Sequence, residues 1–174
     1  FDAEELVNRL SERGLSSHLV NTQASNKQEY LLRPDLGRRL DASSSSELKN
    51  LRGSFDLSLI ISDGLSAEAV RKNALDFISH FVPLANDLNL RMAPIVIVRN
   101  GRVAVQDQIG ESLGARIALI ALGERPGLGS ADSLGLYFVF GPRLGRTDAD
   151  RNCISNVRDG GLPPDIAARK VLYM

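Results

Sequence analysis

Residues 55–61 read FDLSLII, residues 94–98 read PIVIV and residues 116–122 read RIALIAL. Each run is short and apolar at nearly every position, which predicts strands that are buried on both faces of a sheet. Between the first two runs, apolar residues at helical spacing predict a helix that begins after Ser66, the expected N-cap. A shorter helix over residues 106–113 is expected between the second run and the third. Alternating strands and helices predict an α/β fold with a mostly parallel sheet and helices on both faces.

Two more elements are expected after these runs. Residues 134–140 carry Leu, Tyr, Phe and Val side chains, which predict a fourth strand. Residues 164–173 predict a C-terminal helix with prolines at its start, where they are tolerated. Inside the helix that follows Ser66, Pro83 is expected to bend the helix or to end it one turn early.

The first 52 residues look different from the rest of the chain. Residues 2–13 predict a helix with acidic residues in its first turn. Residues 16–41 are polar and interrupted by proline and glycine, which indicates a turn or a docking arm rather than a core element. In the serine run that follows, Ser44 and Glu47 fit a capping box for a short helix, and a low-complexity linker is the alternative. We therefore divide the chain into an arm, residues 1–52, and an α/β domain, residues 53–174.

Composition excludes several classes of protein. The chain has 174 residues, with 21 basic and 21 acidic side chains that cancel, so nucleic acid is not expected as its main partner. It has one cysteine and two histidines, which excludes an internal disulfide framework and predicts no metal site built by this chain. No apolar run approaches the roughly 20 residues that span a bilayer, so no membrane association is expected and a cytoplasmic protein is predicted.

A glycine-rich segment follows the third apolar run. Gly127 and Gly129 suggest a dinucleotide-binding loop, but Asp132 stands where the third glycine is required, so an independent nucleotide-binding enzyme is only a third hypothesis. Glu124 is expected at the carboxyl end of a buried strand, where open α/β sheets bind ligands. It either accepts a hydrogen bond from a polar ligand or pairs with Arg125 in a tight loop.

A second polar segment covers residues 145–158 and contains three arginines, several acidic and amide side chains, and Cys153. This hydrogen-bonding capacity suits a polar ligand with many amide groups, or a protein interface. The alternative is an exposed helix with surface ion pairs, each contributing about 0.5 kcal/mol. A lone cysteine is most often a small buried hydrophobic residue.

Taken together, residues 123–129 (GERPGLG) and 147–156 (TDADRNCISN) closely resemble the small subunit of adenosylcobalamin-dependent ethanolamine ammonia-lyase. Residues 30–40 and 62–66 are also similar to that family. The resemblance covers most of the chain, from about residue 28 to its end. It implies a Rossmann-like α/β domain that covers the cobalamin, which agrees with the fold class predicted from the strands.

The resemblance implies a subunit of a hetero-oligomeric lyase. In the family, a large subunit binds ethanolamine and converts it to acetaldehyde and ammonia by a radical mechanism, with adenosylcobalamin between the subunits. The family's cofactor contacts fall here on Val103, Glu124 and Cys153. Val103 is expected to offer a backbone amide and an apolar contact, Glu124 a carboxylate for a corrin amide, and Cys153 a packing surface. No catalytic residue and no metal ligand is expected from this chain.

Two further expectations concern the cobalt ligand and the ends of the chain. The chain lacks the Asp-x-His-x-x-Gly motif that supplies a histidine to cobalt in another cobalamin class, so the cofactor's own base is expected to keep that position. The family's small subunits run longer, and this chain begins with Phe1 rather than methionine, so terminal segments are expected to be missing. A place inside a bacterial microcompartment is left open. The alternative function is a non-catalytic assembly subunit that does not contact the cofactor.

Overall fold

The computed structural model describes residues 2–125 and 130–174. In chain order, its helices, 3₁₀ turns (η) and strands are α1 (Ala3–Ser11), β1 (Ser17–Asn21), α2 (Lys27–Leu32), η1 (Leu36–Arg38), α3 (Ala42–Asn50), β2 (Phe55–Ser62), α4 (Ala67–Asp87), β3 (Ile95–Arg99), α5 (Val105–Leu113), β4 (Ala115–Glu124), β5 (Ser133–Phe140), η2 (Asp148–Asp150), β6 (Arg151–Val157) and α6 (Pro164–Tyr173).

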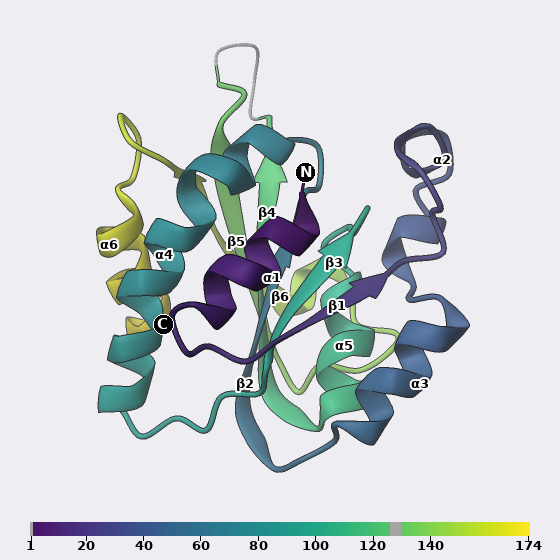
Figure 1. The fold of residues 1–174 in the computed structure, drawn as a ribbon, viewed down its shortest axis with the longest axis horizontal. Helices are drawn as coiled ribbons and strands as arrows, with labels where there is room; N and C mark the ends of the chain where they lie inside the picture. The colour runs from purple at the N-terminus through teal and green to yellow at the C-terminus, as the bar shows by residue number, and fades with distance from the viewer. Residues whose placement is uncertain (1, 126–129) are drawn as a thin grey trace.

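The strands form one six-stranded sheet in the order β1-β3-β2-β4-β5-β6 (Figure 1). The pairs β1–β3, β3–β2 and β2–β4 are parallel, whereas β4–β5 and β5–β6 are antiparallel. The predicted α/β fold is confirmed, but the sheet is mixed. Parallel neighbours need a crossover connection of a dozen or more residues. The connections between the last three strands, residues 125–132 and 141–150, are shorter than this, so these strands pair antiparallel.

Helices cover both faces of the sheet. On one face, which we call the α4 side, α1, α4 and α6 pack on side chains such as Leu59 and Leu119. On the other face, the α5 side, α3 and α5 pack on side chains such as Ile60 and Ile120. Because β2 and β3 face helices on both sides, their side chains are buried at consecutive positions, as their continuous apolar sequences predict.

The helix boundaries match the sequence predictions in part. The Ser66 side chain accepts a hydrogen bond from the Ala69 backbone N–H, so the expected N-cap of α4 is confirmed. Pro83 lies inside α4, which continues to Asp87, so an end one turn early is wrong. The helix α3 starts earlier than predicted, because Asp41 rather than Ser44 caps it.

The segment of residues 16–41 contains more regular structure than its sequence indicates. Residues Ser17–Asn21 form β1 at the edge of the sheet, so the expectation of no core element there is wrong. Among the five residues of β1 only Val20 is fully buried, which is why the apolar signal is weak. The short helix α2 stands away from the sheet (Figure 1). In the part of the chain that the structure describes, no helix is long and apolar enough to cross a membrane.

Candidate functional site

The three predicted site residues lie in three separate parts of the fold. Val103 lies in the connection between β3 and α5, Glu124 is the last residue of β4, and Cys153 lies in β6. Cys153 pairs directly with Tyr137 of β5, and Tyr137 pairs with Ile120 of β4. Side chains that oppose one another in neighbouring antiparallel strands point to the same face of the sheet.

That face is the α5 side. Tyr137 and Val103 both pack against its core, to which Ile120 also belongs. Glu124 lies four residues beyond Ile120 on β4, so strand alternation places it on the same face. The structure therefore brings Val103, Glu124 and Cys153 to one side of the sheet. Their roles toward a cofactor remain predictions.

The Glu124 side chain is half-buried and hydrogen-bonded. The Tyr137 hydroxyl donates to Glu124 Oε1. The carboxylate lies over Gly135, where an added Cβ would come within 2.5 Å of Glu124 Oε2 and 2.8 Å of Tyr137 Cε2. The alternative that Glu124 pairs with Arg125 is not the arrangement found. The glycines of the proposed nucleotide loop, Gly127 and Gly129, lie outside the described residues.

Tyr137 contacts the predicted site residue Glu124, and the sequence did not predict this contact. A glycine inside a strand often marks a close approach of neighbouring groups, so Gly135 is the signal that points to this position. Burial raises the pKa of the Tyr137 phenol, and its hydrogen bond to Glu124 raises it further. The phenol is therefore protonated at neutral pH and remains a hydrogen-bond donor.

A polar cluster holds the loop that carries Val103. The Arg102 guanidinium lies 4.4 Å from the centroid of the Tyr30 ring, and Lys27 Nζ lies 4.5 Å from the same centroid. Arg102 also donates to two carbonyls, its backbone N–H to Gly37 (2.8 Å) and Nη2 to Tyr30 (2.8 Å). These contacts fix α2 and η1 against the β3–α5 connection, so the N-terminal segment helps to place Val103.

The polar segment of residues 145–158 forms η2 and the edge strand β6, not an exposed helix. Arg151 makes two hydrogen bonds to Asp107 of α5, at 2.7 and 2.8 Å, and both side chains are only 3% exposed. Arg146 pairs with Asp150 at 3.1 Å. Much of the hydrogen-bonding capacity of the segment is therefore used within the fold. Cys153 is exposed, contrary to the buried position that is common for a lone cysteine.

The site has features that fit a large amide-bearing ligand such as a corrin. Four β6 side chains are exposed and leave this edge of the sheet accessible: Asn152, Cys153, Ser155 and Asn156. Gly135 leaves the space that the Glu124 carboxylate occupies. In the first turn of α5, three residues after Val103, Gln106 is fully buried. Both polar atoms of its side-chain amide lack a hydrogen-bond partner among the described residues. Among those residues no cluster of three or more His, Cys, Asp or Glu side chains is arranged to hold a metal ion.

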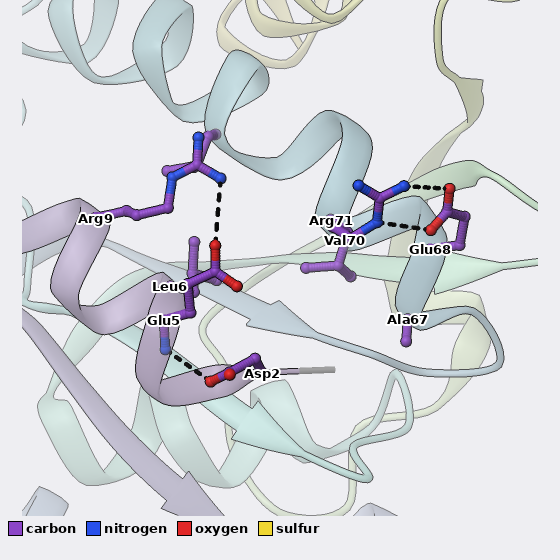
Figure 2. A pocket seen from close by; sticks show the side chains of 9 residues that line it. Asp2, Glu5, Leu6, Arg9, Ala67, Glu68, Val70 and Arg71 are labelled. Carbon is purple, nitrogen blue, oxygen red and sulfur yellow. Dashed lines mark hydrogen bonds and ion pairs between the residues drawn. The ribbon is translucent and has the colours of Figure 1, made fainter.

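A separate pocket lies between α1 and α4 (Figure 2). Four of its charged side chains form two pairs: Arg71 makes two hydrogen bonds to Glu68, at 2.7 and 2.8 Å, and Arg9 lies 4.0 Å from Glu5. None of Val103, Glu124 and Cys153 lines this pocket. It is therefore not the site that the sequence predicts.

The two tyrosines predict how stability changes in alkali. Burial raises the pKa of Tyr30 as well as that of Tyr137 above the ordinary value of about 10. Above that pH the unfolded chain loses these protons first, so the free energy of unfolding falls as the pH rises. We expect a shallower fall for Tyr137→Phe than for the unmodified protein, measured by urea unfolding between pH 8 and 11. Equal slopes would contradict the burial of this phenol.

Comparisons with known proteins extend these observations. The family model described as "Ethanolamine ammonia-lyase light chain (EutC)" matches residues 1–174. Proteins named ethanolamine ammonia-lyase small subunit are 47% identical in Pseudomonas putida strain GB-1 and 48% identical in P. putida strain W619, each over 178 aligned residues. A protein of the same name from P. fluorescens strain SBW25 is 46% identical.

Each alignment covers the whole of this chain. The chain spans 65% of the length of the two P. putida relatives and 64% of the length of the P. fluorescens relative. The resemblance seen in residues 123–129 and 147–156 thus extends over all 174 residues. This chain belongs to the ethanolamine ammonia-lyase light chain family.

Proposed function

We propose that this chain is the cobalamin-covering region of an ethanolamine ammonia-lyase small subunit. In this proposal a large subunit binds ethanolamine and converts it to acetaldehyde and ammonia, and adenosylcobalamin lies between the two subunits. The family membership supports the proposal, since the relatives carry the name of that subunit. The parallel half of the sheet, β1 to β4, is the part that we propose to be Rossmann-like. The proposed location is the cytoplasm, and the alternative is a bacterial microcompartment within it.

One observation supports the cofactor role most strongly. Val103, Glu124 and Cys153 are separated by 21 and 29 residues in the chain, yet they lie on the same face of one sheet. Val103 follows the parallel strand β3, and Glu124 is the last residue of the parallel strand β4. Both therefore lie at the carboxyl-terminal edge of the sheet, where α/β sheets bind ligands. A flat ligand that spans several strands requires such a layout.

We assign each of the three residues a role that its chemistry permits. The Glu124 carboxylate accepts a hydrogen bond from a side-chain amide of the corrin, since an ionised carboxylate is an acceptor only. Val103 contributes its apolar side chain and its backbone amide. Cys153, which is exposed on β6, packs against the cofactor. None of these roles requires a proton transfer by this chain.

When bound, adenosylcobalamin supplies the radical for the reaction. The residues of this chain orient the cofactor and keep water from its covered face. In cofactor enzymes the cofactor generally carries out the chemistry, and the protein binds and positions it. Cobalt ligation is not assigned to any residue of this chain.

The alternative proposal, an assembly subunit without cofactor contact, has one observation in its favour. Leu31 and Leu32 of α2 are 53% and 72% exposed, and α2 stands away from the sheet (Figure 1). Two adjacent exposed leucines suit a protein interface better than solvent. Under this alternative, α2 binds the large subunit and the cofactor is held elsewhere.

Replacement of Glu124 distinguishes the two proposals. In the full-length small subunit assembled with the large subunit, we expect Glu124→Ala to raise the Kd for hydroxocobalamin about tenfold, because a charged hydrogen-bond partner is lost. Equilibrium dialysis measures this Kd, and gel filtration measures the complex. Glu12→Ala, which removes an exposed carboxylate after α1, is the control and should change neither. An unchanged Kd, or loss of the complex in Glu124→Ala, would contradict the cofactor role.

A further inference from the structure

We propose that Tyr137 is a positioning residue, which holds the Glu124 carboxylate over Gly135 in the orientation that receives the corrin amide. This inference rests on the proposed function of Glu124 as a cofactor contact. Neither the sequence resemblance nor the family comparison assigns a role to Tyr137 or Gly135. Two features of the structure support it: the register of the β4–β5 pair and the space above Gly135.

The register explains how the two side chains meet. Glu124 pairs with Ser133 at the end of β4, Leu122 pairs with Gly135, and Ile120 pairs with Tyr137. Alternation along the strands places Gly135 between Tyr137 and the end of the hairpin, on the α5 side. Because Gly135 has no side chain, the phenol of Tyr137 and the carboxylate of Glu124 approach each other above it.

The contacts above Gly135 support this placement. A Cβ at residue 135 would lie 2.5 Å from Glu124 Oε2, 2.6 Å from Glu124 Cδ and 2.8 Å from Tyr137 Cε2. Both side chains therefore occupy the space that any other residue would fill. The Tyr137 hydroxyl donates to Glu124 Oε1, while Glu124 Oε2 has no donor among the described residues. One oxygen of the carboxylate is thus fixed by the protein and the other is left for a ligand.

Tyr137 also connects Glu124 with a second predicted contact. It pairs directly with Cys153 on the neighbouring strand β6 and packs against the α5-side core, which contains Val139 and Leu122. The phenol ring is therefore held by its neighbours on both sides, while its hydroxyl reaches Glu124. Removal of the hydroxyl alone should preserve this packing and release the carboxylate.

The test compares matched variants of the full-length small subunit in its complex with the large subunit. Tyr137→Phe removes the hydroxyl, Gly135→Ala fills the space below the carboxylate, and Glu124→Ala removes the carboxylate itself. Glu12→Ala is again the control, because Glu12 is exposed after α1. Hydroxocobalamin binding is measured by equilibrium dialysis, assembly by gel filtration and folding by thermal melts.

We expect Tyr137→Phe and Gly135→Ala to raise the Kd for hydroxocobalamin about fivefold, in line with the loss of one hydrogen bond, with assembly intact. Glu12→Ala should leave the Kd unchanged. In the double variant Glu124→Ala with Tyr137→Phe, the Kd should equal that of Glu124→Ala alone, because the tyrosine acts through the carboxylate. This lack of additivity is a result that a merely structural role for Tyr137 does not produce.

Three outcomes of the Kd measurements would contradict the positioning role of Tyr137. If Glu124→Ala weakens binding and Tyr137→Phe does not, Tyr137 has no positioning role and the proposed function stands. If the effects of the two variants add, Tyr137 acts independently of Glu124. If neither variant changes the Kd, both the inference and the cofactor role of Glu124 are wrong.

Discussion

The variant Asp107→Asn is expected to lower the free energy of unfolding by about 3 kcal/mol, since it removes the buried carboxylate that pairs with Arg151. Among the described residues, Arg151 then keeps only the exposed Asp148 carboxylate, 3.4 Å from Nε, and the Arg146 carbonyl, 3.3 Å from Nη2. Arg151 Nη1 and Nη2 each donate to one Asp107 oxygen, and both side chains are 3% exposed. Because the pair joins β6 to α5, loss of β6 packing should accompany the destabilisation. Urea unfolding measures the change.

The second carboxylate near Arg151, that of Asp148, provides a matched control. Asp148 lies 3.4 Å from Arg151 Nε but its side chain is 97% exposed, so Asp148→Asn should change stability by less than about 0.5 kcal/mol. Replacement of both buried partners by apolar residues, Asp107→Leu with Arg151→Met, should recover much of the loss. Equal effects of Asp107→Asn and Asp148→Asn would contradict the burial of this ion pair.

The second large effect is expected at Gly123, the residue before Glu124. A Cβ there would lie 2.0 Å from the Ser66 carbonyl oxygen and 2.5 Å from the Asp63 carbonyl oxygen. The Gly123 carbonyl also accepts from the backbone N–H groups of Leu65 (2.7 Å) and Ser66 (3.2 Å). Gly123→Ala must therefore push the β2–α4 connection away from β4. We expect a loss of about 3 kcal/mol, at the upper end of the range for overpacking.

Gly135→Ala is the appropriate comparison for this prediction. Its Cβ would meet only side-chain atoms, the Glu124 carboxylate and the edge of the Tyr137 ring, of which the carboxylate can rotate away. The Cβ of Gly123→Ala meets backbone atoms. Thermal melts should therefore show a much larger loss for Gly123→Ala. A Gly123→Ala variant that melts no lower than Gly135→Ala would show that the connection is looser than described.

The centre of the fold could be predicted from the sequence because its strands are buried on both faces. The runs in β2, β3 and β4 are apolar at consecutive positions, and this pattern predicted their type and approximate limits. The edge strands were missed for the opposite reason. β6 has one fully buried residue, Val157, and polar or charged side chains at most other positions. Such a strand forms because it hydrogen-bonds to a neighbouring strand, here β5, and the sequence pattern does not reveal that pairing.

The candidate site could be predicted only in part. The resemblance to the family identified Val103, Glu124 and Cys153 as candidates. The antiparallel pairing of β5 and β6 was not predicted, so it could not be derived that these three residues share one face of the sheet. For the same reason Tyr137 was missed. Its contact with Glu124 depends on the β4–β5 register and on the absence of a side chain at Gly135. The Arg151–Asp107 pair joins residues 44 positions apart, whereas the sequence suggested ion pairs within one segment.

The most direct test of the central claim is a measurement of ammonia release from ethanolamine as a function of adenosylcobalamin concentration. The large subunit is assayed alone and after assembly with the full-length small subunit that contains these residues. We expect activity to require both the small subunit and the cofactor. If the large subunit alone releases ammonia equally well at the same cofactor concentrations, this chain is not needed to hold adenosylcobalamin, and the account is contradicted.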